Sequence, residues 1–249
     1  MAQRISINEY YTKMKTIIII PARWESIRLP GKPLAMIGDK PMIQHTWERA
    51  CESNADEVII ACDSKIVYDA AIKFGAKVIW TPDAETGTER VFGLFKQKTK
   101  DVDFIINVQG DEPFINPKDI NEVIKIVHNH PDKVATLRTD LIGNEGKDPN
   151  VVKAICNAIG LVGMFTRSSI YMRTNFAYKH VGIYGYSSKI LNKISLLEPT
   201  ESSIKDSLEQ LTWMDNNIPI IASWTSYRSL GVDTRDDLLE ANKIYLKND

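Results

Sequence analysis

The chain lacks several features that mark large classes of protein. It has three cysteines in 249 residues and no Cys-x-x-Cys pair, which disfavours a disulfide framework and a structural zinc site. Its 31 Lys and Arg residues nearly balance its 32 Asp and Glu residues, whereas a nucleic-acid-binding domain is normally clearly basic. The longest apolar runs, such as residues 17–20, are far shorter than the roughly 18 residues of a membrane span. We therefore expect neither nucleic acid nor a membrane as a partner.

Targeting and nucleotide-binding motifs of the best-known kinds are also missing. Residues 1–15 carry charges and tyrosines where a secretory signal would have an apolar stretch. Together with Cys51, Cys62 and Cys156 read as reduced thiols, this predicts a cytoplasmic protein. Neither Gly-x-x-x-x-Gly-Lys-Ser/Thr nor Gly-x-Gly-x-x-Gly occurs, so the sequence does not point to a Walker-type ATPase or a dinucleotide-binding dehydrogenase.

Short apolar, β-branched segments alternate with segments of helical period through the first half of the chain. This alternation is typical of right-handed βαβ units and a parallel sheet. The predicted strands are residues 17–20, 57–61, 77–80, 104–108 and 134–137. The predicted helices between them are residues 42–53, 65–74, 88–98 and 117–130.

The pattern changes after about residue 140. Strand-like segments follow one another at residues 151–156, 161–165 and 180–186, and helices return at residues 188–197 and 204–216. A strand near residues 218–223 and a helix from Thr234 or Arg235 to Tyr245 complete the chain. We interpret residues 1–249 as one α/β domain. Its core covers about 16–139 and 218–249, and an added α+β lobe covers about 140–217.

The first predicted strand is followed by a loop rich in positive charge. Arg23, Arg28 and Lys32 lie there, with Gly31 and three prolines restricting the backbone. Ligands of open α/β sheets bind beyond the carboxyl ends of the strands, and three cations there suit a triphosphate and a departing pyrophosphate. The alternative is that these side chains are merely solvated surface charges.

Two acids follow other predicted strands. Asp111 comes after residues 104–108, and Asp233 precedes the last predicted helix. Mg²⁺ prefers one or two carboxylates completed by substrate phosphates and water, so the pair predicts a magnesium site. The alternative for Asp233 is a helix N-cap.

Eight blocks of the sequence, taken in order, resemble the 3-deoxy-manno-octulosonate cytidylyltransferases (CMP-Kdo synthetases). These enzymes activate a sugar acid with CTP for lipopolysaccharide or capsule biosynthesis. The similarity runs from about residue 17 to residue 239 and includes Arg-Leu-Pro-Gly-Lys-Pro-Leu at 28–34 and Asn-Val-Gln-Gly-Asp-Glu-Pro at 107–113. It implies a Rossmann-like, mixed but mostly parallel sheet of the nucleotide-diphospho-sugar transferase type. The blocks are residues 21–23, 28–34, 40–43, 87–90, 107–113, 180–186, 208–211 and 231–234.

The resemblance also implies roles for individual residues. It makes Arg23, Arg28, Lys32, Asp111 and Asp233 catalytic, and it makes the last two the ligands of Mg²⁺. The implied nucleotide-binding residues are Pro21, Ala22, Arg23, Arg28, Lys32, Gly87, Thr88, Gln109 and Asp111. The implied binding residues for the 2-keto-3-deoxy sugar acid are Gln109, Arg167, His180, Tyr184, Glu209 and Gln210. A homodimer built through the lobe is implied as well.

The sequence allows alternative interpretations of the lobe residues, the substrate and the class of protein. Taken singly, His180 and Tyr184 are typical of packing, and Glu209 and Gln210 on a helix are typical of solvent-facing positions. The chain departs from the family after Arg167, at residues 168–173 with Tyr171 at a usual proline position, and around residues 208–211. An 8-amino-3,8-dideoxy sugar acid is therefore an alternative substrate. A glycosyltransferase is disfavoured because Asp-x-Asp is absent at Asp111, and a non-catalytic nucleotide-binding module is the remaining alternative.

Overall fold

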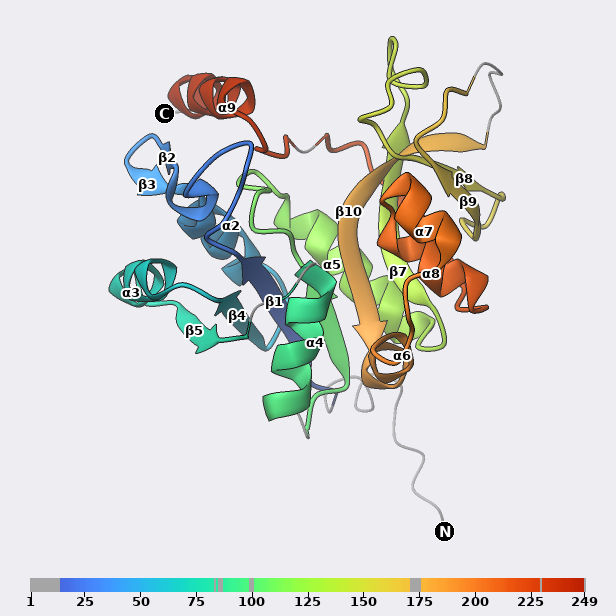
Figure 1. Cartoon of the computed structure of the whole chain (residues 1–249), viewed down its shortest axis with the longest axis horizontal. Coiled ribbons are helices and arrows are strands. Elements are labelled where there is room, and N and C mark those ends of the chain that lie inside the picture. The colour runs from blue at the N-terminus through green and yellow to red at the C-terminus, as the bar shows by residue number, and fades with distance from the viewer. Residues whose placement is uncertain are drawn as a thin grey trace.

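A central sheet with helices on both faces forms the body of the computed structural model (Figure 1). The structure describes residues 14–82, 84, 87–98, 101–170, 176–228 and 230–248. Within these ranges nine strands join one sheet, in which β11, β7, β10, β6, β1, β4 and β5 lie in that order, with β8 and β9 attached to β10. The α/β fold class predicted from the sequence is confirmed.

The strands of this sheet correspond closely to the predicted ones. They are β1 (Thr16–Ala22), β4 (Glu57–Cys62), β5 (Lys77–Trp80), β6 (Phe104–Asn107), β7 (Val134–Asp140), β8 (Lys153–Cys156), β9 (Val162–Thr166), β10 (Ala177–Ser187) and β11 (Ile220–Trp224). The helices are α2 (Met42–Cys51), α3 (Lys65–Lys73), α4 (Gly87–Lys98), α5 (Pro117–Asn129), α6 (Ser188–Ile194), α7 (Glu201–Asp206), α8 (Glu209–Asp215) and α9 (Arg235–Asn248). None of the described helices is long and apolar enough to cross a membrane.

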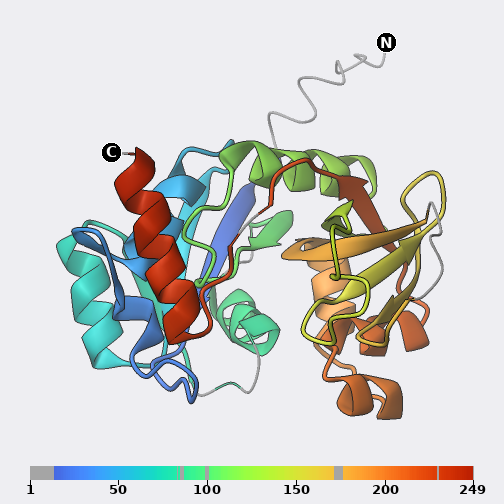
Figure 2. The same cartoon turned by 90° about the horizontal axis from the view of Figure 1, so that it is seen from above.

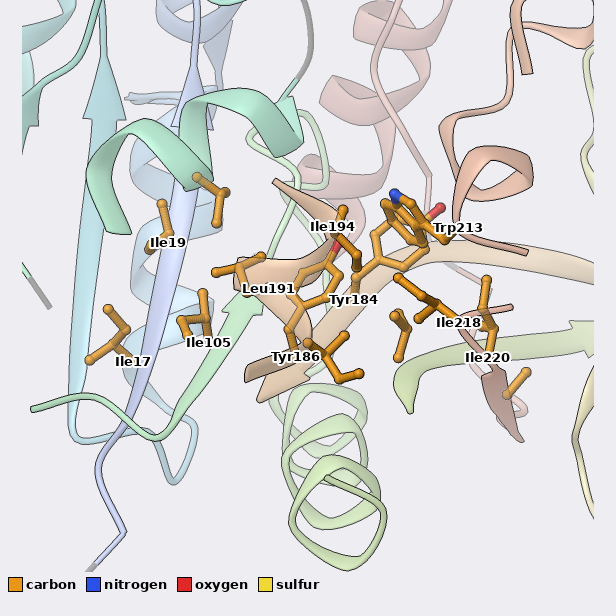
Figure 3. Close-up of a cluster of buried hydrophobic side chains, with 14 of the residues drawn as sticks. Ile17, Ile19, Ile105, Tyr184, Tyr186, Leu191, Ile194, Trp213, Ile218 and Ile220 are labelled. Carbon is orange, nitrogen blue, oxygen red and sulfur yellow. The ribbon is translucent and has the colours of Figure 1, made fainter. Parts of the chain in front are cut away.

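The unbroken apolar run of β1 is explained by helices on both faces of the sheet. Ile17 and Ile19 pack in one cluster with residues of α4, α6 and α8 (Figure 3), whereas Ile18 and Ile20 pack in a second cluster with residues of α2, α3 and α5. Side chains alternate between the faces of a strand, so a strand covered on both sides is apolar throughout. β1 is therefore rigidly held, and its carboxyl end is a fixed support for the loop that follows.

One antiparallel strand, β10, joins the two parts of the molecule. Its C-terminal half lies between β6 and β7 and runs antiparallel to both, and its N-terminal half pairs with β8. A register shift between Val181 and Gly185 divides these halves, and a Cβ atom on Gly185 would lie 2.8 Å from Val123 Cγ1 of α5. β10 therefore belongs both to the core and to the region 140–217 that was predicted as a lobe of the same domain (Figure 2).

One local prediction was wrong, and one small element was not predicted. The helix predicted at 204–216 is two helices, because Ser207 takes a left-handed conformation (φ 51°) and Leu208 an extended one between α7 and α8. The sequence pattern also missed a small hairpin, β2 (Met36–Ile37) and β3 (Lys40–Pro41), which follows the short helix η1 (Lys32–Leu34). Its turn at Gly38 has φ +59°, and a Cβ there would overlap the ring of Tyr245 in α9. The departure noted at Tyr171 lies outside the described residues.

Candidate active site

Lys32 lies at the centre of the site, between the two acids predicted to bind metal. Its Nζ atom is 2.5 Å from Asp111 Oδ2 and 3.0 Å from Asp233 Oδ1, and Arg28 Nη2 is 3.0 Å from the same Asp233 oxygen. Burial alone would lower the pKa of Lys32, but the two carboxylates raise it above its usual value. The lysine is therefore a fixed cation, and the predicted phosphate-binding loop and predicted metal ligands form one charge cluster.

The backbone itself holds the two acids together. Val232 N–H donates to Asp111 O at 2.9 Å, which brings residue 233 beside the turn that follows β6. Val232 also packs in a small apolar cluster with Leu29, Ile37, Met42 and Ala241. This cluster attaches α9 to the loop that carries Lys32.

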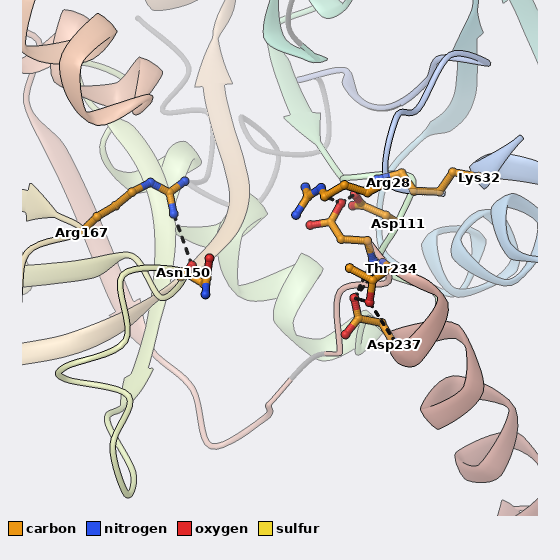
Figure 4. A network of polar contacts seen from close by, with 8 residues as sticks. Arg28, Lys32, Asp111, Asn150, Arg167, Thr234 and Asp237 are labelled. Atoms are coloured by element: carbon orange, nitrogen blue, oxygen red, sulfur yellow. Dashed lines mark hydrogen bonds and ion pairs between the residues drawn. The ribbon is translucent and has the colours of Figure 1, made fainter. Parts of the chain in front are cut away.

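The alternative interpretation of Asp233 as a helix N-cap is wrong. The start of α9 is capped by Thr234 and Asp237: Asp237 N–H donates to Thr234 Oγ1 at 3.2 Å, and Thr234 N–H donates to Asp237 Oδ2 at 2.8 Å (Figure 4). Such a reciprocal arrangement is a capping box. The carboxylate of Asp233 is left to face Lys32 and Arg28.

A cavity of about 300 Å³ opens beyond the carboxyl ends of β1 and β6. A Cβ on Gly110, in its wall, would lie 2.7 Å from Pro21 O, so only glycine fits where these two loops meet. Arg28 and Thr88 are not among the lining residues and Arg28 instead contacts Asp233. The predicted nucleotide-binding residues that line the cavity are Pro21, Ala22, Arg23, Lys32, Gly87, Gln109 and Asp111.

A larger cavity of about 660 Å³ lies beside it, between the sheet and the lobe. Arg167 and Asp111 lie on opposite sides of this cavity (Figure 4). It shares Gln109 and Asp111 with the smaller cavity, so the two are contiguous. All six residues predicted to bind the sugar acid line it: Gln109, Arg167, His180, Tyr184, Glu209 and Gln210. The structure thus brings together residues from four separate regions of the sequence.

Gln210 is buried and Glu209 is half-buried, although helix residues of these types are usually solvent-facing. Gln210 is 3% exposed, and Glu209 accepts a hydrogen bond from Thr88 Oγ1 at 2.7 Å. Burial raises the pKa of Glu209 to about 7, with the Thr88 hydrogen bond opposing the shift. Thr88 lies in the first turn of α4, so the carboxyl group connects the lobe to the core.

His180 and Tyr184 are packed and also line the larger cavity. The His180 ring contacts the rings of Phe165 and Tyr184, and its Nε2 is 2.9 Å from Thr136 Oγ1. Burial lowers the pKa of His180 to about 4 and raises that of Tyr184 well above its usual value. Both side chains are therefore neutral near pH 7, so they meet a ligand as hydrogen-bonding groups.

Arg167 supplies a positive charge on the lobe side of this cavity. Its Nε donates to Asp206 O at 3.1 Å, and its Nη1 donates to the carbonyl oxygens of Pro149 and Asn150. Three backbone acceptors therefore fix the guanidinium group without neutralising it.

Comparison with known proteins identifies the family. A family model for cytidylyltransferases matches residues 17–229. The chain belongs to the cytidylyltransferase family. A 3-deoxy-manno-octulosonate cytidylyltransferase from Fusobacterium nucleatum subsp. nucleatum is 40% identical over 232 residues, which cover 90% of this chain and 94% of the relative. One from Thermodesulfovibrio yellowstonii (strain ATCC 51303 / DSM 11347 / YP87) is 36% identical over 249 residues, covering 92% and 98%.

A solved structure agrees with this assignment. It is the structure of CMP:2-keto-3-deoxy-manno-octonic acid synthetase complexed with CTP, with a TM-score of 0.89 and 37% identity, and the match covers 94% of this chain and 99% of the other. The resemblance predicted from the eight sequence blocks is confirmed. This cytidylyltransferase is a CTP-dependent nucleotidyltransferase.

Two buried residues beside the smaller cavity of this cytidylyltransferase were not predicted. Arg90 of α4 is 2% exposed and pairs with Asp63, which follows β4. Arg90 belongs to the block at residues 87–90 that contributes to the family resemblance. A signal was present for Asp63 as for Asp111, because each acid lies in the loop after a buried strand, with Asp63 directly after β4.

The acids Asp111 and Asp233 fit a divalent cation by their chemistry. Both reach the same Lys32 nitrogen, so their oxygens already converge on one cationic position. Among the described residues no group of three or more His, Cys, Asp or Glu side chains converges in this way. A divalent ion here would therefore take most of its ligands from phosphate and water, as Mg²⁺ commonly does.

The raised pKa of Glu209 predicts a pH dependence of stability. An ordinary Glu titrates near 4.5 and the folded one near 7, so the folded state binds the proton more tightly. The free energy of unfolding contributed by Glu209 should then fall as the pH rises from about 4.5 to about 7. Urea unfolding at intervals from pH 4.5 to 8 should show wild type losing stability relative to Glu209→Gln over that range.

Glu201→Gln, at an exposed position in the first turn of α7, is the matched control. It should follow wild type at every pH. A constant difference between wild type and Glu209→Gln would contradict the burial argument.

Proposed function

We propose that this cytidylyltransferase transfers CMP from CTP to the anomeric hydroxyl of 3-deoxy-manno-octulosonate, for lipopolysaccharide or capsule biosynthesis. The observation that carries the proposal is the pair of contiguous cavities. The smaller is lined by cations suited to phosphate, and the larger is lined by all six predicted sugar-binding residues. The two relatives described above carry this substrate in their names and match over 98% and 94% of their own length, which supports the same assignment here.

In this proposal the reaction occurs where the cavities meet. The anomeric oxygen attacks the α-phosphorus of CTP in line, the bond to the bridging oxygen of the β-phosphate breaks, pyrophosphate leaves and the hydroxyl proton is released. Arg23 and Lys32 line the smaller cavity, where they would neutralise the charge that develops on the leaving group. Backbone groups near Ala22 and Gly87 would read the cytosine edge.

The larger cavity suits a sugar acid in charge and hydrogen-bonding capacity. Arg167 is the cation for the carboxylate, because a guanidinium group can hold a carboxylate through two hydrogen bonds. Gln109, Glu209 and Gln210 would donate to and accept from hydroxyls, with the neutral His180 and Tyr184 beside them. Positioning the two substrates in line is the main contribution of these side chains.

Mg²⁺ is the metal we propose for the site, held by Asp111 and Asp233. When bound, it would neutralise phosphate charge and help orient the triphosphate. Lys32 and Arg28 contact these carboxylates, and with Mg²⁺ and CTP bound the same two side chains would turn to phosphate oxygens.

A pyrophosphate-release assay tests the proposed function. Each of the four NTPs is combined with 3-deoxy-manno-octulosonate, its 8-amino analogue or sialic acid, with Mg²⁺ present. We expect release with CTP and 3-deoxy-manno-octulosonate, at a kcat/KM at least tenfold above every other combination. Release with none of the combinations would contradict the activity. Preference for the 8-amino sugar would show that the departures around residues 208–211 have changed the substrate.

Asp111→Asn should remove most of the activity. The change keeps the size of the side chain but removes the charge that would hold Mg²⁺ and that contacts Lys32. We expect kcat to fall roughly 10²–10³-fold, as for loss of one preorganised charged group. Asp132→Asn is the control, because Asp132 is 69% exposed and pairs only with the adjacent Lys133 among the described residues. Near-normal magnesium-dependent turnover by Asp111→Asn would refute its role.

We further propose that the enzyme is a cytoplasmic homodimer assembled through the lobe. Cys51, Cys62 and Cys156 are all unpaired, which suits a reducing compartment. Two apolar residues beside β8 are each half exposed: Met164 in β9 and Phe176, which directly precedes β10. Phe176 lines an apolar groove of about 390 Å³ with Ile155 and Val162. Exposed apolar surface of this kind is typical of an interface.

Sedimentation velocity at micromolar concentration tests the dimer. Wild type should sediment at twice the mass of the 28.2 kDa chain, and Met164→Glu should shift it to the monomer by placing a charge in an apolar contact. Ile66→Glu is the control, because Ile66 is also about half exposed (55%) but lies on α3, far from the lobe. A monomeric wild type, or a Met164→Glu variant that stays dimeric, would contradict the proposed interface.

A further inference from the structure

An ion pair between Asp63 and Arg90 connects the loop after β4 to α4, and its arginine lines the smaller cavity. Arg90 Nη2 is 2.5 Å from Asp63 Oδ2, and the two side chains are 2% and 16% exposed. Arg90 Nη1 also donates to Thr81 Oγ1 at 2.6 Å and to Pro82 O at 3.3 Å, just beyond β5. Removing either partner of a buried ion pair is strongly destabilising, because it leaves an uncompensated buried charge.

The other oxygen of Asp63 reaches the loop that carries the phosphate-binding cations. Asp63 Oδ1 accepts a hydrogen bond from Trp24 N–H at 3.2 Å, and Trp24 directly follows Arg23. The Trp24 ring lies against Gly31, since a Cβ built there would be 3.1 Å from Trp24 Cη2. Gly31 has φ +68° and directly precedes Lys32.

These contacts form a continuous path from the ion pair to both ends of the loop. Asp63 fixes the backbone at residue 24, and the Trp24 ring then limits where Gly31, and with it Lys32, can lie. Arg90 lies in α4 together with Gly87, and both residues line the cavity. One carboxylate therefore contacts both the cationic loop, at Trp24, and α4, at Arg90.

We propose that Asp63 is a positioning residue that keeps Arg23 and Lys32 in the geometry required by the triphosphate of CTP. The inference rests on the proposed function only in taking CTP as the ligand of the loop. Asp63 acts through Trp24 and Arg90. Because displacements of about 1 Å in a positioning group can cost on the order of 10²-fold in rate, loss of this support weakens nucleotide binding without touching the sugar cavity.

The experiment measures CTP binding and the two Michaelis constants separately. Asp63→Ala removes both contacts, whereas Asp63→Asn keeps an oxygen for Trp24 N–H and loses the charge that faces Arg90. We expect the Kd for CTP, measured by calorimetry on the full chain with Mg²⁺, to rise about tenfold or more for Asp63→Ala and less for Asp63→Asn. The KM for the sugar acid should stay within twofold of wild type in both. Asp69→Ala, which removes an exposed pair with Lys65 on α3, should leave both constants unchanged.

A second variant separates positioning from general loss of structure. Trp24→Phe keeps an aromatic ring but removes the ring atoms that reach Gly31, so it should raise the Kd for CTP in the same direction. Since Asp63→Ala and Trp24→Phe interrupt one path, adding Asp63→Ala to Trp24→Phe should increase the Kd by less than twofold. Full additivity of the two effects, an unchanged Kd for CTP in Asp63→Asn, or equal rises in both Michaelis constants would overturn the proposal. Failure of wild type to bind CTP would instead overturn the proposed function. The first three outcomes overturn only the role of Asp63, so the two failures can be distinguished.

Discussion

The ammonium group of Lys32 between Asp111 and Asp233 is the interaction around which the site is organised. Two carboxylates that reach the same point repel each other unless a cation lies between them. The backbone enforces their approach, because Val232 N–H bonds to Asp111 O and Val232 packs against the loop that carries Lys32. A position that demands positive charge is thereby built into the fold, and lysine, arginine or a divalent ion can satisfy it.

The two cavities differ in the state of their polar groups. Around the smaller one the side chains are ionic and paired, as in Lys32 with Asp111 and Arg90 with Asp63. In the larger one burial moves pKa values towards the neutral forms, as for His180 and Glu209. Charged groups suit a triphosphate and neutral donors and acceptors suit hydroxyls, so a single chain offers different chemistry in two contiguous cavities.

The antiparallel strand β10 accounts for the position of the larger cavity. It pairs with β6 and β7 in the core and with β8 in the lobe, so His180 and Tyr184 reach the cavity from the same strand that joins the two parts. The break at Ser207 turns α8 so that Glu209 meets Thr88 of α4. Core and lobe are therefore joined both through β10 and through the Glu209–Thr88 hydrogen bond.

Local pattern in the sequence determined the alternation of strands and helices, the continuous apolar strand at residues 17–20 and the acids and cations that follow the strands. These features depend on neighbouring residues and on burial, which periodicity reports. Family resemblance added Arg167, His180 and Glu209. Only the tertiary structure decided that β10 lies between β6 and β7, that Thr234 rather than Asp233 caps α9, and that Asp63 and Arg90 support the loop. Each of these depends on contacts between residues distant in the chain, and local propensity carries no information about such pairs.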